Sequence, residues 1–157
     1  MRFTIFQDSR QGDREGNEDR VGYSYSRDVL LMVTADGMGG HAQGEVAAEI
    51  AVTEITRLFQ QEARNKLRRP SDFLVSVINA AHRAIVSHAV AENLLESPRT
   101  TCVVCIVQEG SAWWAHAGDS RLYVLRGGKL AAATQDHSRV QQMVDSGVIT
   151  PEAAALH

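Results

Sequence analysis

The sequence is poor in the residues that mark several special classes of protein. Its 157 residues include two cysteines and three prolines, and the formal net charge is −3. Two cysteines cannot supply the disulfide framework of a small secreted domain. Without a basic excess there is no broad electrostatic case for binding nucleic acid or an anionic membrane. No apolar run approaches the length of a membrane span, so we expect neither a nucleic-acid nor a membrane partner.

What remains is typical of a globular protein. Hydrophobic residues make up 44% of the chain and charged residues 22%, which are ordinary values for a soluble domain. A chain of this length can bury a core without disulfides, and we expect one domain over residues 1–157. The first eight residues lack the apolar core of a signal peptide, so a cytoplasmic location is the expectation.

The two cysteines form a C-x-x-C pair, a spacing found in redox sites and half-zinc sites. Cys102 and Cys105 lie inside the β-branched run 101–107, however, which predicts a strand. Side chains three positions apart on a strand point to opposite faces. We therefore expect two buried, unreactive thiols.

Alternating and apolar runs predict strands at 3–9, 21–26, 29–35, 101–108, 112–117, 122–126 and 129–133. Helical spacing predicts helices over 42–64, from a cap at Ser71 and Asp72 to residue 89, over 137–146, and from residue 150. The pairs 110–111 and 127–128 predict hairpin turns. Runs of strands separated from runs of helices favour an α+β domain with mainly antiparallel sheet.

The stretch with the strongest functional signal follows the buried strand predicted at 29–35. Asp36 stands where that strand ends, and Gly37, Gly39 and Gly40 allow the backbone to turn tightly before the next helix. A rigid element that carries a carboxylate into a flexible loop is a common arrangement for chemistry. An ordinary strand-to-helix turn is the alternative interpretation.

Acidic residues recur in the predicted loops and strand ends, at Glu18 and Asp19, at Asp36 and at Asp119. Carboxylates without a matching set of Cys and His suit hard cations such as Mg²⁺ or Mn²⁺. Arg14 precedes the first cluster, and an arginine fork beside a carboxylate-bound metal is suited to holding a phosphoryl group.

Four stretches resemble, in order, motifs of the metal-dependent protein phosphatases, the PP2C or PPM family. They are residues 14–19, 35–41, 99–101 and 117–121, and residues 134–138 resemble a further family element. The form of 36–45 resembles the bacterial branch. The resemblance covers essentially the whole chain and implies an α+β fold, a four-layer α-β-β-α sandwich of two mainly antiparallel sheets flanked by helices.

The resemblance also implies roles for individual residues. Asp36 matches the carboxylate that bridges two metal ions, and Gly37 matches the residue whose carbonyl binds one of them. Asp19 matches an acid that binds metal directly or through water, a role that Glu18 could share. Asp119 matches an acid linked to a third, weaker ion.

Arg14 matches the phosphate-binding arginine. The implied reaction is hydrolysis of phosphoserine or phosphothreonine in proteins by a hydroxide that bridges two Mn²⁺ or Mg²⁺ ions. Phosphorylated proteins would be the substrates, and a cognate Ser/Thr kinase would be the opposing partner.

The sequence departs from the family pattern in two ways. Met38 stands where eukaryotic members often have a histidine proposed as general acid, and His41 is near but not equivalent. The family also continues with two further metal-binding aspartates, and Asp136 and Asp145 occur in other contexts. We therefore expect residues 1–157 to be a phosphatase-like domain that lacks its C-terminal part.

Three hypotheses follow. The first is a bacterial protein Ser/Thr phosphatase of which this chain is the N-terminal portion. The second is a truncated, catalytically inactive module that binds a phosphoprotein, and its incomplete sheets would favour a homodimer. The third, a P-loop nucleotide enzyme, is weak because the glycine-rich stretch lacks the Gly-Lys-Ser/Thr ending.

Overall fold

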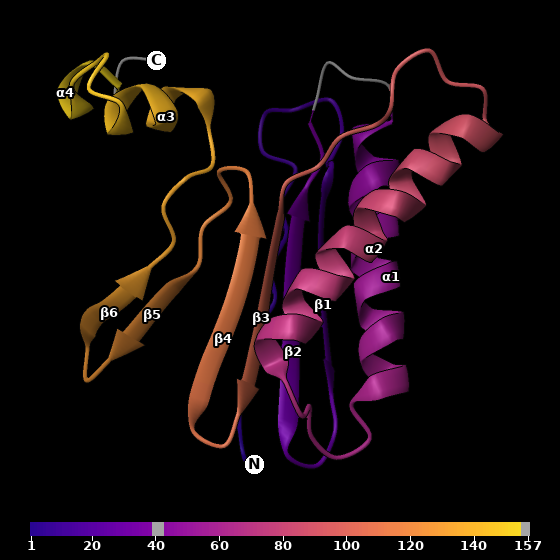
Figure 1. Ribbon diagram of the computed structural model, residues 1–157, viewed down its shortest axis with the longest axis vertical. Helices are drawn as coiled ribbons and strands as arrows, with labels where there is room; N and C mark the ends of the chain where they lie inside the picture. The colour runs from indigo at the N-terminus through magenta and orange to yellow at the C-terminus, as the bar shows by residue number, and fades with distance from the viewer. Residues whose placement is uncertain (39–42, 155–157) are drawn as a thin grey trace.

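The computed structural model describes residues 1–38 and 43–154. Its elements in chain order are β1 (Asp19–Tyr25), β2 (Val29–Asp36), α1 (Gly44–Glu62), α2 (Pro70–Ala91), β3 (Cys102–Gln108), β4 (Ser111–Ala117), β5 (Tyr123–Arg126), β6 (Lys129–Ala133), α3 (Arg139–Asp145) and α4 (Pro151–Ala154). Strands β1 to β4 form one antiparallel sheet in that order, and β5 and β6 form a second (Figure 1). The predicted α+β class with two antiparallel sheets and flanking helices is confirmed.

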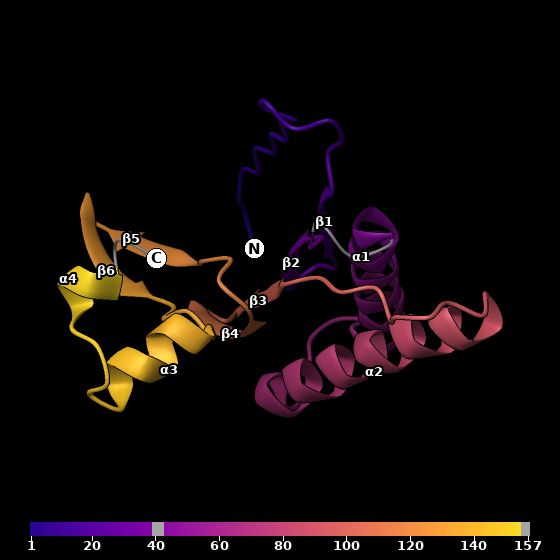
Figure 2. The same cartoon turned by 90° about the horizontal axis from the view of Figure 1, so that it is seen from above.

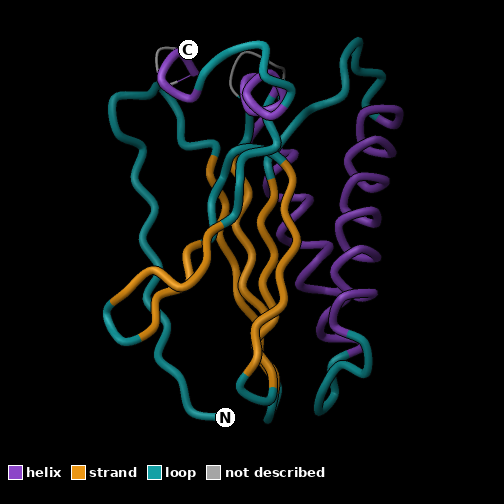
Figure 3. Tube along the Cα trace, turned by 60° about the vertical axis from the view of Figure 1, so that its left-hand side comes forward, coloured by secondary structure: helices purple, strands orange, loops and turns teal. Residues whose placement is uncertain are grey.

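Helices α1 and α2 cover one face of the four-stranded sheet, as Figures 2 and 3 show. Alternate residues of the two central strands point into this layer, because side chains on a strand alternate between faces. The helices meet each other at Phe59 and Phe73, whose ring centroids are 6.2 Å apart. The largest fully buried side chains of this core are Phe59, Leu31, Ile55, Ile106, Val29, Val77 and Val104.

The other face of the sheet carries a row of side chains that includes Tyr23, Met32, Cys105 and Trp114, which are register neighbours across the four strands. Tyr23 and Trp114 are exposed. The N-terminal segment runs along this side of the sheet, opposite the helices (Figure 2). Within the described residues, no helix covers this face in the way that α1 and α2 cover the other.

The strand predicted at 3–9 is wrong, since residues 1–18 of the described chain contain no strand. The segment contacts the sheet through side chains: the rings of Phe3 and Tyr25 meet edge to face, with centroids 5.4 Å apart. A strand requires a ladder of backbone hydrogen bonds to a neighbour. Weak alternation in the sequence does not supply such a neighbour.

Two local predictions also need correction. Helix α2 begins at Pro70, with no side-chain cap, so the predicted cap at Ser71 and Asp72 is wrong. Proline has the fixed φ that suits the first helical position, and Asp72 instead pairs with Arg69 at 3.0 Å. The turn between β3 and β4 lies one residue earlier than predicted, at Glu109–Gly110, where both φ angles are positive.

The thiols of Cys102 and Cys105 are buried and unbonded to each other, as predicted. Cys102 belongs to the core on the helical side of the sheet, and Cys105 lies in the row on the opposite face. Burial raises the pKa of the Cys102 thiol to about 12 and that of Cys105 to about 11. Burial and the raised pKa both disfavour the thiolate, which is the form that acts as a nucleophile.

Among the described residues, α2 is long and apolar enough to cross a membrane, by length and composition alone. It lies instead against α1 and the sheet, with one face buried. The buried positions follow helical spacing: Phe73, Leu74, Val77, Ala81, Ile85 and Ala89. This is the pattern of a core helix.

Candidate functional site

Two carboxylates face each other at one end of the four-stranded sheet. Asp19 opens β1 and Asp36 closes β2, and the register of these antiparallel strands makes them direct partners. Like charges directly opposite each other destabilise a sheet. The pKa of Asp36 is raised, first by burial and then by the charges of Asp19, Asp119 and Glu18. An arrangement that concentrates negative charge in this way is suited to binding a cation.

The backbone around Gly37 is crossed closely by a second chain segment. The Gly37 N–H donates to the Glu18 carbonyl at 3.1 Å, and a Cβ at position 37 would overlap the backbone of Gly44 at the start of α1. Only glycine fits this crossing. The crossing fixes the position of the Gly37 peptide immediately after Asp36.

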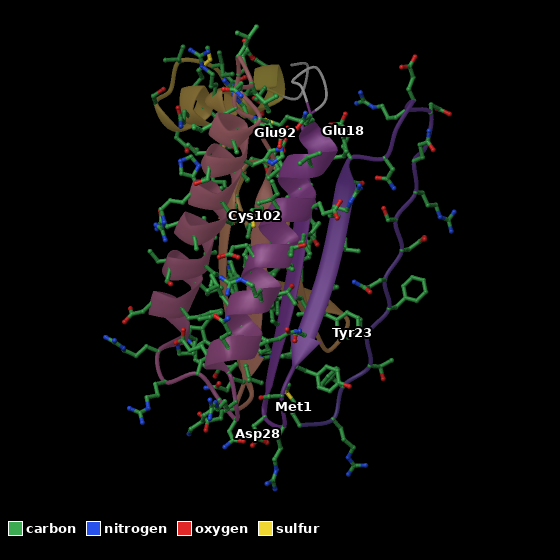
Figure 4. All side chains as sticks on the ribbon, turned by 90° about the vertical axis from the view of Figure 1, so that its right-hand side faces the viewer. Met1, Glu18, Tyr23, Asp28, Glu92 and Cys102 are labelled. Atoms are coloured by element: carbon green, nitrogen blue, oxygen red, sulfur yellow. The ribbon has the colours of Figure 1, made fainter. Side chains whose placement is uncertain are left out.

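Glu18 lies beside the start of α1 (Figure 4). Its Oε2 atom is buried and has no hydrogen-bond partner among the described residues, and it lies so close to Gly44 that a side chain there would collide with it. A carboxylate is favoured at a helix N-terminus, where the peptide dipoles give a partial positive charge. Glu18 therefore adds a third negative group behind the Asp19–Asp36 pair.

The predicted site residues line one cleft of about 850 Å³. Arg14 enters it from the exposed loop before β1, and Asp119 enters from the loop after β4. The lining consists of Arg10, Gln11, Asp13, Arg14, Glu15, Gly16, Asn17, Glu18, Asp19, Asp36, Gly37, Met38, Thr101 and Asp119. The structure thus brings together residues from positions 14 to 119, and the roles given to Arg14, Asp19, Asp36, Gly37 and Asp119 stay predictions.

The chemistry of this cleft suits a hard cation, because its donors are carboxylate and carbonyl oxygens. Within residues 1–38 and 43–154, no group of three or more His, Cys, Asp or Glu side chains is arranged to hold an ion. The carboxylates share the cleft, and their role as metal ligands stays a prediction.

The structure describes Met38, which stands where eukaryotic members often have the histidine proposed as general acid. Met38 donates its backbone N–H to the carbonyl of Arg99 at 3.0 Å, and its thioether carries no proton, so this side chain cannot be a general acid. His41 lies outside the described residues. His82 is exposed, whereas His88 is half-buried and its Nε2 lies 3.1 Å from Oε1 of Gln43.

Residues 134–138, which resemble a family motif, hydrogen-bond to the loop that carries Asp119. Arg121 makes a two-pronged pair with the carboxylate of Asp136, at 2.6 and 2.8 Å, and the guanidinium lowers the pKa of Asp136. The backbone N–H of His137 donates to the Gly118 carbonyl at 2.8 Å. Asp136 thus pairs with arginine and is not among the residues that line the cleft.

Sequence reasoning gave no role to several residues that hold the acids in place. The side chain of Asn17 accepts the backbone N–H of Asp19 at 3.0 Å. The hydroxyl of Thr100 donates to the Asp36 carbonyl at 2.9 Å, and the hydroxyl of Thr101 accepts the Asp36 N–H at 3.0 Å. The run 99–101 resembles a family motif, but that resemblance did not indicate that its threonines contact Asp36.

The family model for protein phosphatase 2C matches residues 7–145. The chain belongs to this family. It is 33% identical over 154 residues to the serine/threonine phosphatase Stp of Listeria monocytogenes. The aligned part covers 97% of this chain and 61% of that protein.

Solved structures agree with this membership. The phosphatase Stp1 of Staphylococcus aureus superposes with a TM-score of 0.84 at 35% identity, covering 97% of this chain and 60% of that one. The catalytic domain of the phosphatase PstP, in complex with two manganese ions, superposes with a TM-score of 0.67 at 36% identity, covering 90% and 58%. The chain spans about three-fifths of the length of these relatives.

Proposed function

We propose that the protein containing this chain hydrolyses phosphoserine and phosphothreonine in proteins, in a reaction that depends on Mn²⁺ or Mg²⁺. The observation that carries the proposal is the pair Asp19–Asp36, placed face to face at a strand end and sharing a cleft with Arg14 and Asp119. Membership of the protein phosphatase 2C family and the manganese-bound relative support it.

The family resemblance gives each of these residues a role. Asp36 would bridge two ions, with Asp19 and the Gly37 carbonyl as further oxygen donors and Asp119 serving a third, weaker position. When bound, the ions supply activation of the attacking water and neutralise charge on the phosphoryl oxygens. Arg14 would bind the phosphoryl group of the substrate, because a guanidinium presents paired donors to its oxygens.

An alternative function is binding of a phosphoprotein without hydrolysis by the 157-residue chain itself. It is favoured by the absence, among the described residues, of a group of three side chains that could hold an ion. The uncovered face of the four-stranded sheet would then favour a homodimer. A cytoplasmic location and a cognate kinase belong to the same proposal.

The deciding experiment measures phosphopeptide turnover with Mn²⁺, with Mg²⁺ and with EDTA, for the 157-residue chain and for the full-length protein. We expect metal-dependent turnover by the full-length protein and little or none by the 157-residue chain. Light scattering on the same samples tests the homodimer. Metal-independent turnover would refute the proposed chemistry. Phosphopeptide binding without turnover by the 157-residue chain would establish the alternative for that chain.

A further inference from the structure

Thr101 lies between the two segments that carry Asp36 and Asp119. It directly precedes β3 and is 2% exposed. Its backbone N–H donates to the Asp36 carbonyl at 2.8 Å, and its Oγ1 accepts the Asp36 N–H at 3.0 Å. Both backbone groups of Asp36 are therefore held by one buried residue that directly precedes the neighbouring strand.

The same side chain also contacts the loop after β4, on both sides of Asp119. Its Oγ1 lies 2.6 Å from the hydroxyl of Ser120, and its methyl group packs on Gly118, where an added Cβ would come within 2.7 Å of Cγ2. A threonine hydroxyl has one donor and two acceptor sites, so it can accept from Asp36 and still bond to Ser120. The two contacts leave Asp119 as the residue between them.

We propose that Thr101 is a positioning residue that sets the separation of the Asp36 and Asp119 carboxylates and thereby the affinity of the cleft for its cations. This inference rests on the proposed function, which makes the cleft a cation site. Thr101 would act through the backbone of Asp36 and through the residues on both sides of Asp119, without touching an ion. Oxygen donors must be held at a suitable separation, because Mg²⁺ in particular tolerates little departure from its preferred geometry.

The chemistry of the side chain predicts an order among substitutions. Thr101→Val keeps the shape but removes the hydroxyl, so the Asp36 N–H loses its buried acceptor and Ser120 loses its partner. Thr101→Ser keeps the hydroxyl and loses only the methyl contact with Gly118. Ser120→Ala removes the hydroxyl that bonds to Thr101. It leaves the bonds between Thr101 and Asp36 intact.

The test measures Mn²⁺ binding to the full-length protein by isothermal titration calorimetry, together with kcat and KM for a phosphopeptide. We expect Thr101→Val to weaken Mn²⁺ binding about tenfold, since the loss of a buried hydrogen bond is of that size, with lower kcat and unchanged KM. Thr101→Ser should restore most of the affinity. The matched control is Thr56→Val on α1, whose buried hydroxyl has no partner among the described residues and whose loss should change neither quantity.

Wild-type Mn²⁺ affinity in a folded Thr101→Val protein would overturn the inference and leave the proposed function standing. If Thr101→Val does not fold, Ser120→Ala decides: weaker Mn²⁺ binding supports the link, and unchanged binding overturns it. If the unsubstituted protein binds neither Mn²⁺ nor Mg²⁺, the proposed function fails and the inference fails with it.

Discussion

Replacing Asp36 by asparagine should stabilise the metal-free protein while removing its response to a cation. Asp36 faces Asp19 directly across the β1–β2 ladder, and like charges in this position cost about 0.2–1 kcal/mol. Asparagine has nearly the same shape and keeps the backbone bonds to Thr101. In EDTA at pH 7 we expect a gain of that size, which raises Tm by up to about 4 °C in a domain of this length.

The pH dependence follows from the raised pKa of Asp36. A carboxyl whose pKa is higher in the folded state binds more protons when folded, so its ionisation destabilises the protein as pH rises above the ordinary value of 3.8. Below 3.8 the carboxyl is protonated in both states and carries no penalty. The advantage of Asp36→Asn in EDTA should therefore be present at pH 7 and disappear as the pH falls below that value.

Adding Mn²⁺ should reverse the order of stability. An ion that binds only the folded protein stabilises it by about 2.7 kcal/mol at a concentration one hundred times its Kd, and Asp36→Asn should lose most of this. Thermal melts with and without Mn²⁺ measure both effects, with Glu96→Gln, at an exposed position in the loop after α2, as a control for the loss of one negative charge. A variant less stable than wild type in EDTA, or one that gains as much from Mn²⁺, would refute the reasoning.

The remaining predictions concern the substrate, the backbone crossing and the thiols. Arg14→Ala should raise KM for phosphopeptides by one to two orders of magnitude, from a lost charged hydrogen-bond pair of about 1.5–3 kcal/mol; loss of Mn²⁺ affinity at unchanged KM would show that the residue is misplaced. Gly37→Ala should lower Tm by several degrees, because its Cβ would overlap Gly44, whereas Gly16→Ala, in open space, should not. Iodoacetamide at pH 8 should label Cys102 and Cys105 only after unfolding, and rapid labelling of the native protein would contradict their burial.

The elements with strong periodic patterns could be predicted from the sequence. The apolar run at 29–33 predicted a strand and lies in β2, which ends at Asp36. The helical repeat that follows predicted a helix and lies in α1. These predictions succeed because burial of a strand or of a helix face requires a particular spacing of apolar residues. The five site residues, Arg14, Asp19, Asp36, Gly37 and Asp119, were found from motifs, and the structure places all of them in one cleft.

The contacts that depend on three-dimensional pairing could not be predicted. The bond between Thr101 and Asp36 joins residues 65 positions apart, and only the β2–β3 register brings them together. The capping prediction at Ser71 failed because proline at position 70 already satisfies the first helical position. The strand predicted at 3–9 failed because a weak local pattern carries no information about a ladder partner.

The pairing of β2 with β3 has a consequence for how the protein folds. The hairpins β1–β2 and β3–β4 join residues that are close in sequence, but Val33 and Val104 pair only after the chain between them, with both long helices, has closed into a loop. Such non-local pairing slows folding, because the entropic cost of closing the loop comes before the stabilising contacts form. Because Thr101 reaches Asp36 through this pairing, the cleft should be assembled only when the slow step is complete. In a refolding experiment, Mn²⁺ binding should therefore follow the slowest phase and lag behind the formation of helix.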